Sequence, residues 1–163
     1  MKSSKAVLVA DIIDNLRRVF QVVNEQSKKA ERETGLTGQQ LWAIKLIAET
    51  GEIKVSELAR RMYLHPATVV GILDRLETRG LVTRRRSEVD RRIVYISLAS
   101  QGRELVVRAP VVAQGLLTSG LEVLSERDVA KIAGSLERLV DILGAQELPP
   151  QLFLSTDKNV ASP

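Results

Sequence analysis

The apolar positions of the chain follow helical spacing over most of its length. In residues 6–32, eight apolar residues share one continuous side of a helix when each residue advances 100° around the axis. They are Leu8, Val9, Ile12, Ile13, Leu16, Val19, Phe20 and Val23. This helix runs past twice the usual length of about 11 to 12 residues, and Gly35 ends it in the manner of a left-handed cap. The helix has more apolar surface than the rest of a small domain needs, so we expect part of it to contact another surface.

A second helix is predicted over residues 38–50. Thr37 and Gln40 have the spacing of a capping box at its start. Apolar residues lie on two sides of it, so we expect it to be buried between two layers. Trp42 lies on the second side, where it serves either as plain core or as the wall of a small-molecule pocket.

The middle of the chain alternates short strands and helices. Ile53 to Val55 is a strand candidate, and Ser56 is expected to cap a brief helix over residues 57–62. His65 precedes Pro66, which suits the first position of a helix predicted to end before Gly80. One face of that helix is apolar at helical spacing, and we expect it to be buried. The polar turn over residues 87–91 separates two strands, 81–86 and 92–98, that predict a half-buried hairpin.

Two further helices are expected after the hairpin. The first covers residues 100–121 and is predicted to bend before Pro110, where a helical hydrogen bond is lost. The second opens with a capping pattern from Ser125 to Asp128 and has an apolar seam at alternating spacings of three and four. That seam consists of Val129, Ile132, Leu136, Leu139 and Leu143. Residues 144–163 are expected to form a flexible tail.

These elements together predict a mainly α fold with a small β-hairpin wing. Residues 37–99 form a winged helix-turn-helix lobe, in which the second helix of the pair is presented to DNA. Residues 1–36 and 100–143 supply dimerisation helices, since a lone winged helix needs neither the long apolar side nor the seam.

The charge is concentrated in the predicted lobe. Ten basic and five acidic residues lie between Lys54 and Leu98, which gives this segment +5 where the whole chain has +4. An anionic partner is therefore expected there, and nucleic acid is the leading candidate. The alternative is a solvated basic face without a partner.

Composition excludes most catalytic chemistry. The chain has no cysteine and one histidine, His65, so thiolate metal sites and cysteine nucleophiles are absent. His65 has no partner constellation for a base or a metal ligand, and no glycine-rich phosphate loop is present. We expect no enzyme activity, no metal and no cofactor. No apolar run is long enough to span a membrane, so a soluble, cytoplasmic protein is expected.

An ordered set of short motifs resembles the multiple-antibiotic-resistance regulator (MarR) family over residues 5–143. The motifs are Val55-Ser56-Glu57-Leu58-Ala59, Thr68-Val69, Asp74-Arg75-Leu76-Glu77, Gly80-Leu81-Val82, Asp90-Arg91-Arg92, and Ser97-Leu98 with Gly102. The resemblance implies a bacterial homodimeric regulator, commonly a repressor that phenolic or other amphipathic ligands release from DNA. Some branches of the family respond to thiol oxidation instead. This chain has no cysteine, so that mode of regulation is excluded.

The resemblance also implies positions for DNA contact. It places His65, Ala67, Thr68 and Gly71 near bases or phosphates, Arg75 near the backbone, and Arg92, oriented by Asp90, in the minor groove. We expect Arg84, Arg86 and Arg91 to complete this set. An Asp two residues before an Arg on a turn fixes a guanidinium independently of the family, although the pair could serve only to stabilise the turn.

Two departures from the family pattern bear on how DNA is recognised. His65 stands where Ser or Thr is usual, and Val70-Gly71 replaces residues that are often polar. Few side chains are therefore available to hydrogen-bond bases, which shifts weight toward shape and phosphate contacts.

The predicted function is that of a sequence-specific transcriptional regulator on a pseudo-palindromic operator. The leading hypothesis is a repressor relieved by an aromatic or amphipathic ligand, in a cavity lined by Phe20 and Trp42. A regulator without its own effector is the closest alternative. A winged-helix module that binds protein instead of DNA is a third, which the basic wing disfavours.

Overall fold

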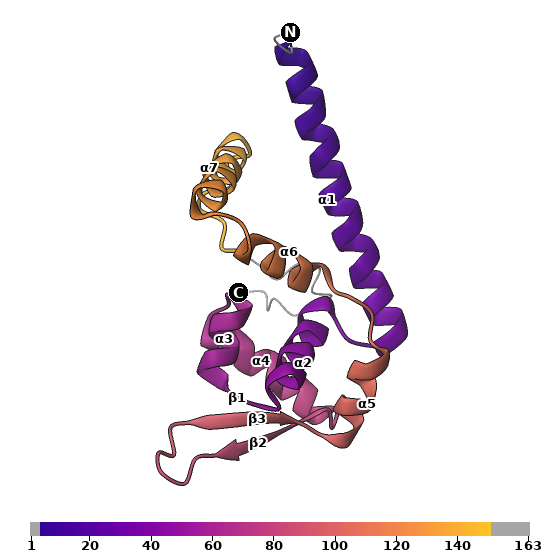
Figure 1. The fold of residues 1–163 in the computed structure, drawn as a ribbon, viewed down its shortest axis with the longest axis vertical. Coiled ribbons are helices and arrows are strands. Elements are labelled where there is room, and N and C mark those ends of the chain that lie inside the picture. The colour runs from indigo at the N-terminus through magenta and orange to yellow at the C-terminus, as the bar shows by residue number, and fades with distance from the viewer. Residues whose placement is uncertain (1–3, 151–163) are drawn as a thin grey trace, which may run out of the picture.

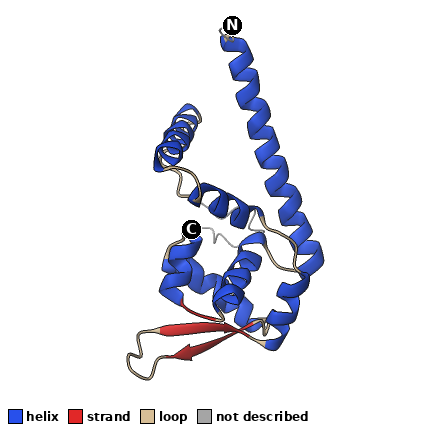
Figure 2. Ribbon diagram, in the orientation of Figure 1, coloured by secondary structure: helices blue, strands red, loops and turns tan. Residues whose placement is uncertain are grey.

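The computed structural model describes residues 4–150, in which helices dominate and three strands form one small sheet (Figures 1 and 2). The elements in order are α1 Lys5–Thr34, α2 Gly38–Thr50, β1 Glu52–Lys54, α3 Val55–Met62, α4 Pro66–Thr78, β2 Val82–Arg86, β3 Val94–Leu98, α5 Ser100–Arg108, α6 Ala113–Glu122 and α7 Glu126–Ile142. The mainly α class with a hairpin wing is confirmed. The last residues of the predicted tail lie outside the described range.

Helix α1 projects far beyond the compact lobe (Figure 1). It ends as predicted at Gly35, whose φ of 67° places it in the left-handed region that glycine adopts without strain. The Arg79 guanidinium donates hydrogen bonds to the carbonyls of Thr34 and Gly35 and so joins the helix end to the lobe. Along α1 only Val23 and Ala30 are buried, so the predicted apolar side is exposed in the single chain except at Val23 and the half-buried Leu16.

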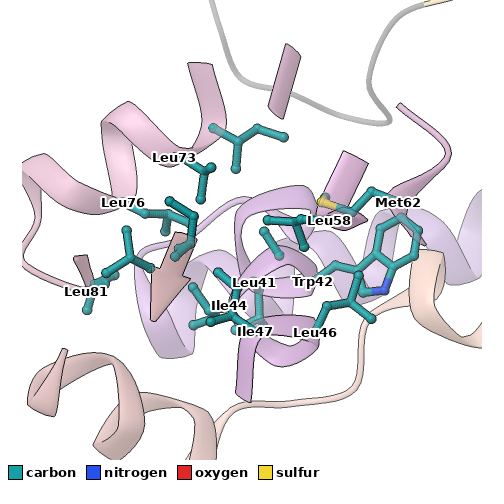
Figure 3. Packing of buried hydrophobic residues seen from close by; sticks show 14 of the residues in the cluster. Leu41, Trp42, Ile44, Leu46, Ile47, Leu58, Met62, Leu73, Leu76 and Leu81 are labelled. Carbon is teal, nitrogen blue, oxygen red and sulfur yellow. The ribbon is translucent and has the colours of Figure 1, made fainter. Parts of the chain in front are cut away.

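The core of the lobe is built around α2, which is buried on two sides as expected (Figure 3). The capping box is present: Gln40 N–H donates to Thr37 Oγ1, and the Thr37 N–H donates to Gln40 Oε1. Leu41, Ile44 and Ile47 are fully buried. Burying aliphatic side chains of this size contributes about 1.5–3 kcal/mol each, so this helix contributes strongly to the lobe's stability.

Helices α3 and α4 form the helix-turn-helix. Helix α3 begins at Val55, one residue after β1, so the prediction that Ser56 caps it is wrong: its N-cap is Lys54, which forms no side-chain cap. Because Val55 already belongs to the helix, Ser56 lies within its first turn. The turn after α3 passes through Tyr63, whose φ of 53° is in the left-handed region. That conformation costs a non-glycine residue about 1–3 kcal/mol.

The three strands form an antiparallel sheet in the order β1-β3-β2. Ile53 pairs with Ile96, and Val82 pairs with Leu98, so the buried side of the sheet faces α2. Gly102 at the start of α5 lies against the chain as it enters β2. A Cβ at Gly102 would lie 2.1 Å from the carbonyl oxygen of Leu81, so no other residue fits without moving backbone.

The segment predicted as one bent helix over residues 100–121 is two helices, α5 and α6. Helix α5 ends at Arg108, and Ala109 is extended with φ −73° and ψ 138°. Proline disfavours the helical region for the residue before it, and Pro110 has no N–H to continue the ladder. The chain therefore breaks instead of bending, and α6 starts in a new direction.

Helix α7 begins as predicted after Ser125, whose Oγ accepts a hydrogen bond from the Asp128 N–H. None of its residues is buried, and Leu136 at the middle of the predicted seam is 53% exposed. Within residues 4–150, no helix is long and apolar enough to cross a membrane.

Candidate nucleic-acid interface

Helix α4 is capped by His65. The His65 Nδ1 accepts a hydrogen bond from the Ala67 N–H at 3.2 Å, and Pro66 occupies the first helical position as predicted. The buried side of α4 consists of Val69, Ile72, Leu73 and Leu76. This packing against the core turns the opposite side of the helix to solvent.

The predicted contact positions of α4 lie mostly on its open side. Ala67, Gly71 and Arg75 are exposed, whereas Thr68 is half-buried. A Cβ at Gly71 would meet no atom within 4 Å, so the surface there is flat and accessible. Small residues at these positions allow a close approach of the helix backbone to a groove, but they provide few base-specific hydrogen bonds.

The wing tip has the predicted Asp90–Arg92 pair. Arg92 Nε lies 3.1 Å from Asp90 Oδ1, Arg92 Nη2 lies 3.1 Å from Asp90 Oδ2, and the Arg92 N–H also donates to Asp90 Oδ1. These hydrogen bonds from Arg92 lower the pKa of the Asp90 carboxyl. The Arg92 side chain is 90% exposed, so the pair orients a guanidinium that stays fully accessible.

Ser87 organises the same turn and was missed from the sequence. Its Oγ accepts hydrogen bonds from the N–H groups of Val89 and Asp90, both at 3.3 Å. The Ile93 N–H then donates to the Asp90 carbonyl and closes the loop. A Ser at the first position of a polar turn is a recognised turn signal, and it could have been singled out on that ground.

Arg84 points from β2 to helix α4. Its Nη2 lies 2.6 Å from Asp74 Oδ1 and 3.4 Å from the Val70 carbonyl, and its Nε lies 3.4 Å from Glu77 Oε2. The side chain is only 28% exposed. Arg84 therefore joins the wing to the recognition helix, and its pairing with two carboxylates disfavours the expected phosphate contact.

The neighbouring arginines differ because successive residues of a strand face opposite sides. Arg85 is paired with both carboxylate oxygens of Glu52 on β1 and lies over the Tyr95 ring, 4.9 Å from its centroid. Arg86 and Arg91 are exposed and form no ion pair with another described residue. These two and Arg92 present the accessible positive charge of the wing.

Trp42 is 7% exposed and packs in the core, and it also borders a cavity of about 250 Å³ between α2, α3 and α6. Charged side chains at the cavity include Lys45, Arg61, Glu49 and Glu122. Arg61 is paired with Glu49 at 3.1 Å. Lys45 donates to the Ala109 carbonyl, and its partial burial lowers its pKa.

Phe20 is not at this cavity. It is 63% exposed on the projecting part of α1 and does not line the cavity beside Trp42. The structure of the single chain thus separates the two residues predicted to bind a ligand together. The α1 residues that face α6 at this level are Val19, Val22 and Val23, which line a separate cavity, and Phe20 is not among them.

A hydrogen bond at the edge of the cavity connects it to the helix-turn-helix. The Tyr63 hydroxyl, in the turn between α3 and α4, donates to Glu122 Oε1 at 3.0 Å. This bond raises the pKa of Tyr63. No group of three or more potential metal ligands occurs among residues 4–150.

The helix pair α3–α4, the strand before it and the β2–β3 hairpin define a winged helix-turn-helix protein, the class of fold in which a helix and a wing meet DNA. The family model described as "MarR family" matches residues 36–94, which cover this lobe up to the start of β3. An organic hydroperoxide resistance transcriptional regulator of Bacillus subtilis is 31% identical over 121 residues, 74% of this chain and 81% of the relative. The chain belongs to the MarR family.

Further comparisons agree with this assignment. The HTH-type transcriptional repressor MdtR of Bacillus subtilis is 29% identical over 133 residues, 82% of this chain and 85% of that protein. The crystal structure of the YusO protein from Bacillus subtilis matches with a TM-score of 0.50 at 30% identity, over 85% of this chain and 99% of that one. The two Bacillus relatives compared by sequence are named as transcriptional regulators, and the family is one of regulators, which confirms the prediction that the chain is no enzyme.

Proposed function

We propose that this protein is a homodimeric, sequence-specific DNA-binding repressor. The observation that carries the proposal is the exposed side of α4 beside a wing whose Arg86, Arg91 and Arg92 are accessible. In a two-fold dimer the two α4 helices enter major grooves about one helical turn apart, near 10 base pairs, on a pseudo-palindromic operator. The name of the relative MdtR as a repressor supports repression as the outcome.

The dimer is supported by apolar surface that the single chain leaves exposed. Leu8, Ile12 and Phe20 on α1 and Leu136 on α7 are at least two-fifths exposed. A cavity of about 320 Å³ between α1 and α6 is lined almost wholly by apolar side chains. Contiguous exposed apolar surface of this kind marks an interface, and we assign it to a second copy, with residues 1–36 and 100–143 as the dimerisation helices.

The effector is supported by the cavity beside Trp42. Its indole offers a flat apolar wall, and the Lys45 ammonium offers a cation whose pKa burial has lowered and which an anionic ligand would stabilise. An aromatic carboxylate fits both. A ligand that displaces Glu122 would break its bond to Tyr63 and so free the turn before α4, which favours a conformation with wrongly spaced α4 helices.

DNA binding is tested by selecting fragments that the protein retains from genomic DNA and measuring affinity over a range of salt. Arg86→Met should make the slope of log affinity against log salt shallower by about 0.9 per phosphate contact, and Arg17→Met on α1 is the matched control. Arg92→Ala should weaken most the sites with a narrow A·T-rich minor groove. If it changes neither affinity nor site preference, the Asp90–Arg92 pair only stabilises the turn.

The effector is tested by quenching of Trp42, the only tryptophan. Aromatic carboxylates should quench its fluorescence and weaken operator binding together, and Lys45→Met should reduce the affinity for carboxylates more than for neutral phenols. If a broad screen finds no ligand that alters both signals, the regulator without its own effector becomes the better description.

A further inference from the structure

The first three residues of α4 leave no backbone N–H free for DNA. The first helical residue, Pro66, has no N–H. The Ala67 N–H donates to His65 Nδ1, while the Thr68 and Val69 N–H groups donate to the His65 carbonyl. Of the first three helical positions, Pro66 therefore has no N–H to offer an anion, and the N–H groups of Ala67 and Thr68 are already bonded.

The cap also determines which tautomer of the neutral imidazole is present. An amide N–H always carries its proton, so the His65 Nδ1 that accepts from Ala67 holds a lone pair. A neutral imidazole has one donor and one acceptor nitrogen, and an imidazolium has two donors and cannot accept. With Nδ1 as acceptor, the proton of the neutral ring is on Nε2.

We propose that His65 is a DNA-contacting residue whose cap to Ala67 holds it in the Nε2–H tautomer and presents that N–H as an uncharged donor to an acceptor on DNA. His65 is exposed, and Nε2 has no hydrogen-bond partner among the described residues. The side chain thus replaces the backbone donors that the cap and Pro66 remove. The DNA half of the inference rests on the proposed function, whereas the tautomer half does not.

An uncharged donor differs measurably from a cation. It adds a hydrogen bond that depends on distance and direction, but it neutralises no phosphate and releases no counterion. Its loss therefore lowers affinity at every salt concentration by the same factor. Loss of a cationic contact makes the salt dependence shallower.

The tautomer is tested by long-range proton–nitrogen NMR on the nitrogen-15-labelled protein at mildly alkaline pH, where the only histidine gives a single pattern. The expected pattern has an unprotonated Nδ1 and a protonated Nε2. A protonated Nδ1 would overturn the inference whether or not the protein binds DNA.

The DNA contact is tested with a matched pair of variants. In His65→Ser the hydroxyl keeps the cap, but its O–H is on a much shorter side chain and cannot reach the acceptor of the Nε2–H. In His65→Ala both the cap and the donor are lost. On a duplex selected by the wild-type protein, His65→Ser should unfold near the wild-type temperature yet bind about tenfold more weakly, because each of two neutral hydrogen bonds per dimer contributes a factor of about three. The salt slope should not change.

Two results would overturn this half of the inference. Wild-type affinity in His65→Ser would show that the Nε2–H makes no contact. A shallower salt slope in that variant would show that His65 acts as a cation. If the wild-type protein binds no duplex at all, the proposed function fails and the donor role fails with it, while the NMR result still decides the tautomer.

Discussion

Replacing Arg84 by Met should separate the positioning of the wing from contact with phosphate. Methionine keeps the unbranched, flexible inner part of the side chain but loses the guanidinium and its ion pairs to Asp74 and Glu77. The Arg84 side chain is 28% exposed, while its two partners are 58% and 44% exposed and regain water easily. Hydrogen bonds to charged groups contribute about 1.5–3 kcal/mol and exposed pairs about 0.2–1 kcal/mol, so we expect a loss of about 1–2 kcal/mol in stability.

The effect on DNA binding should exceed what stability alone explains. Arg84 holds β2 against α4, so without it the distance between the wing and the recognition helix is no longer fixed. We expect weaker binding to the selected operator with an unchanged salt slope, since a guanidinium already paired with carboxylates neutralises no phosphate. Arg86→Met is the control, because Arg86 is exposed on the same strand and should change the slope without changing stability.

Urea unfolding at fixed protein concentration and salt-dependent binding titrations measure the two effects. A double-mutant cycle with Asp74→Asn should give a coupling energy of about 1 kcal/mol. An Arg84→Met protein with wild-type stability and a shallower salt slope would refute the argument, since it would show that Arg84 leaves Asp74 to bind phosphate.

The other predictions concern packing, assembly and the wing tip. Gly102→Ala should lower the free energy of unfolding by about 1–3 kcal/mol or more, because its Cβ meets backbone, whereas Gly71→Ala, with open space around it, should not destabilise α4. Leu136→Glu should convert the dimer to monomer in sedimentation equilibrium, and a dimer of unchanged affinity would contradict the proposed interface. Arg92 lowers the pKa of Asp90, so the wing tip should be fully ordered above the unfolded pKa of this carboxyl and should lose that order as the pH falls through the folded pKa. NMR of the wing amides should show this transition in the wild-type protein and not in Asp90→Asn.

The sequence by itself determined most of the elements, because the signals that start and end them act within a few residues. The capping box at Thr37 and Gln40, the left-handed Gly35 and Pro66 after His65 are all where the pattern predicted them. The Asp90–Arg92 pair was likewise predictable, since both residues belong to one turn. Prediction was less reliable where the helical spacing of residues 100–121 competed with the helix-breaking effect of Pro110. The proline ended a helix that was expected only to bend.

Only the tertiary structure decided which of these residues act on one another. Strand alternation places Arg85 on the opposite face of the strand from Arg84 and Arg86. It does not reveal that Asp74 and Glu77 of α4 lie within ion-pair distance of Arg84. Tyr63 and Glu122 are 59 residues apart and meet only because α6 crosses the lobe. The energy of such a contact depends on distances set by the packing of whole helices on a shared core, and no spacing along the chain encodes those distances.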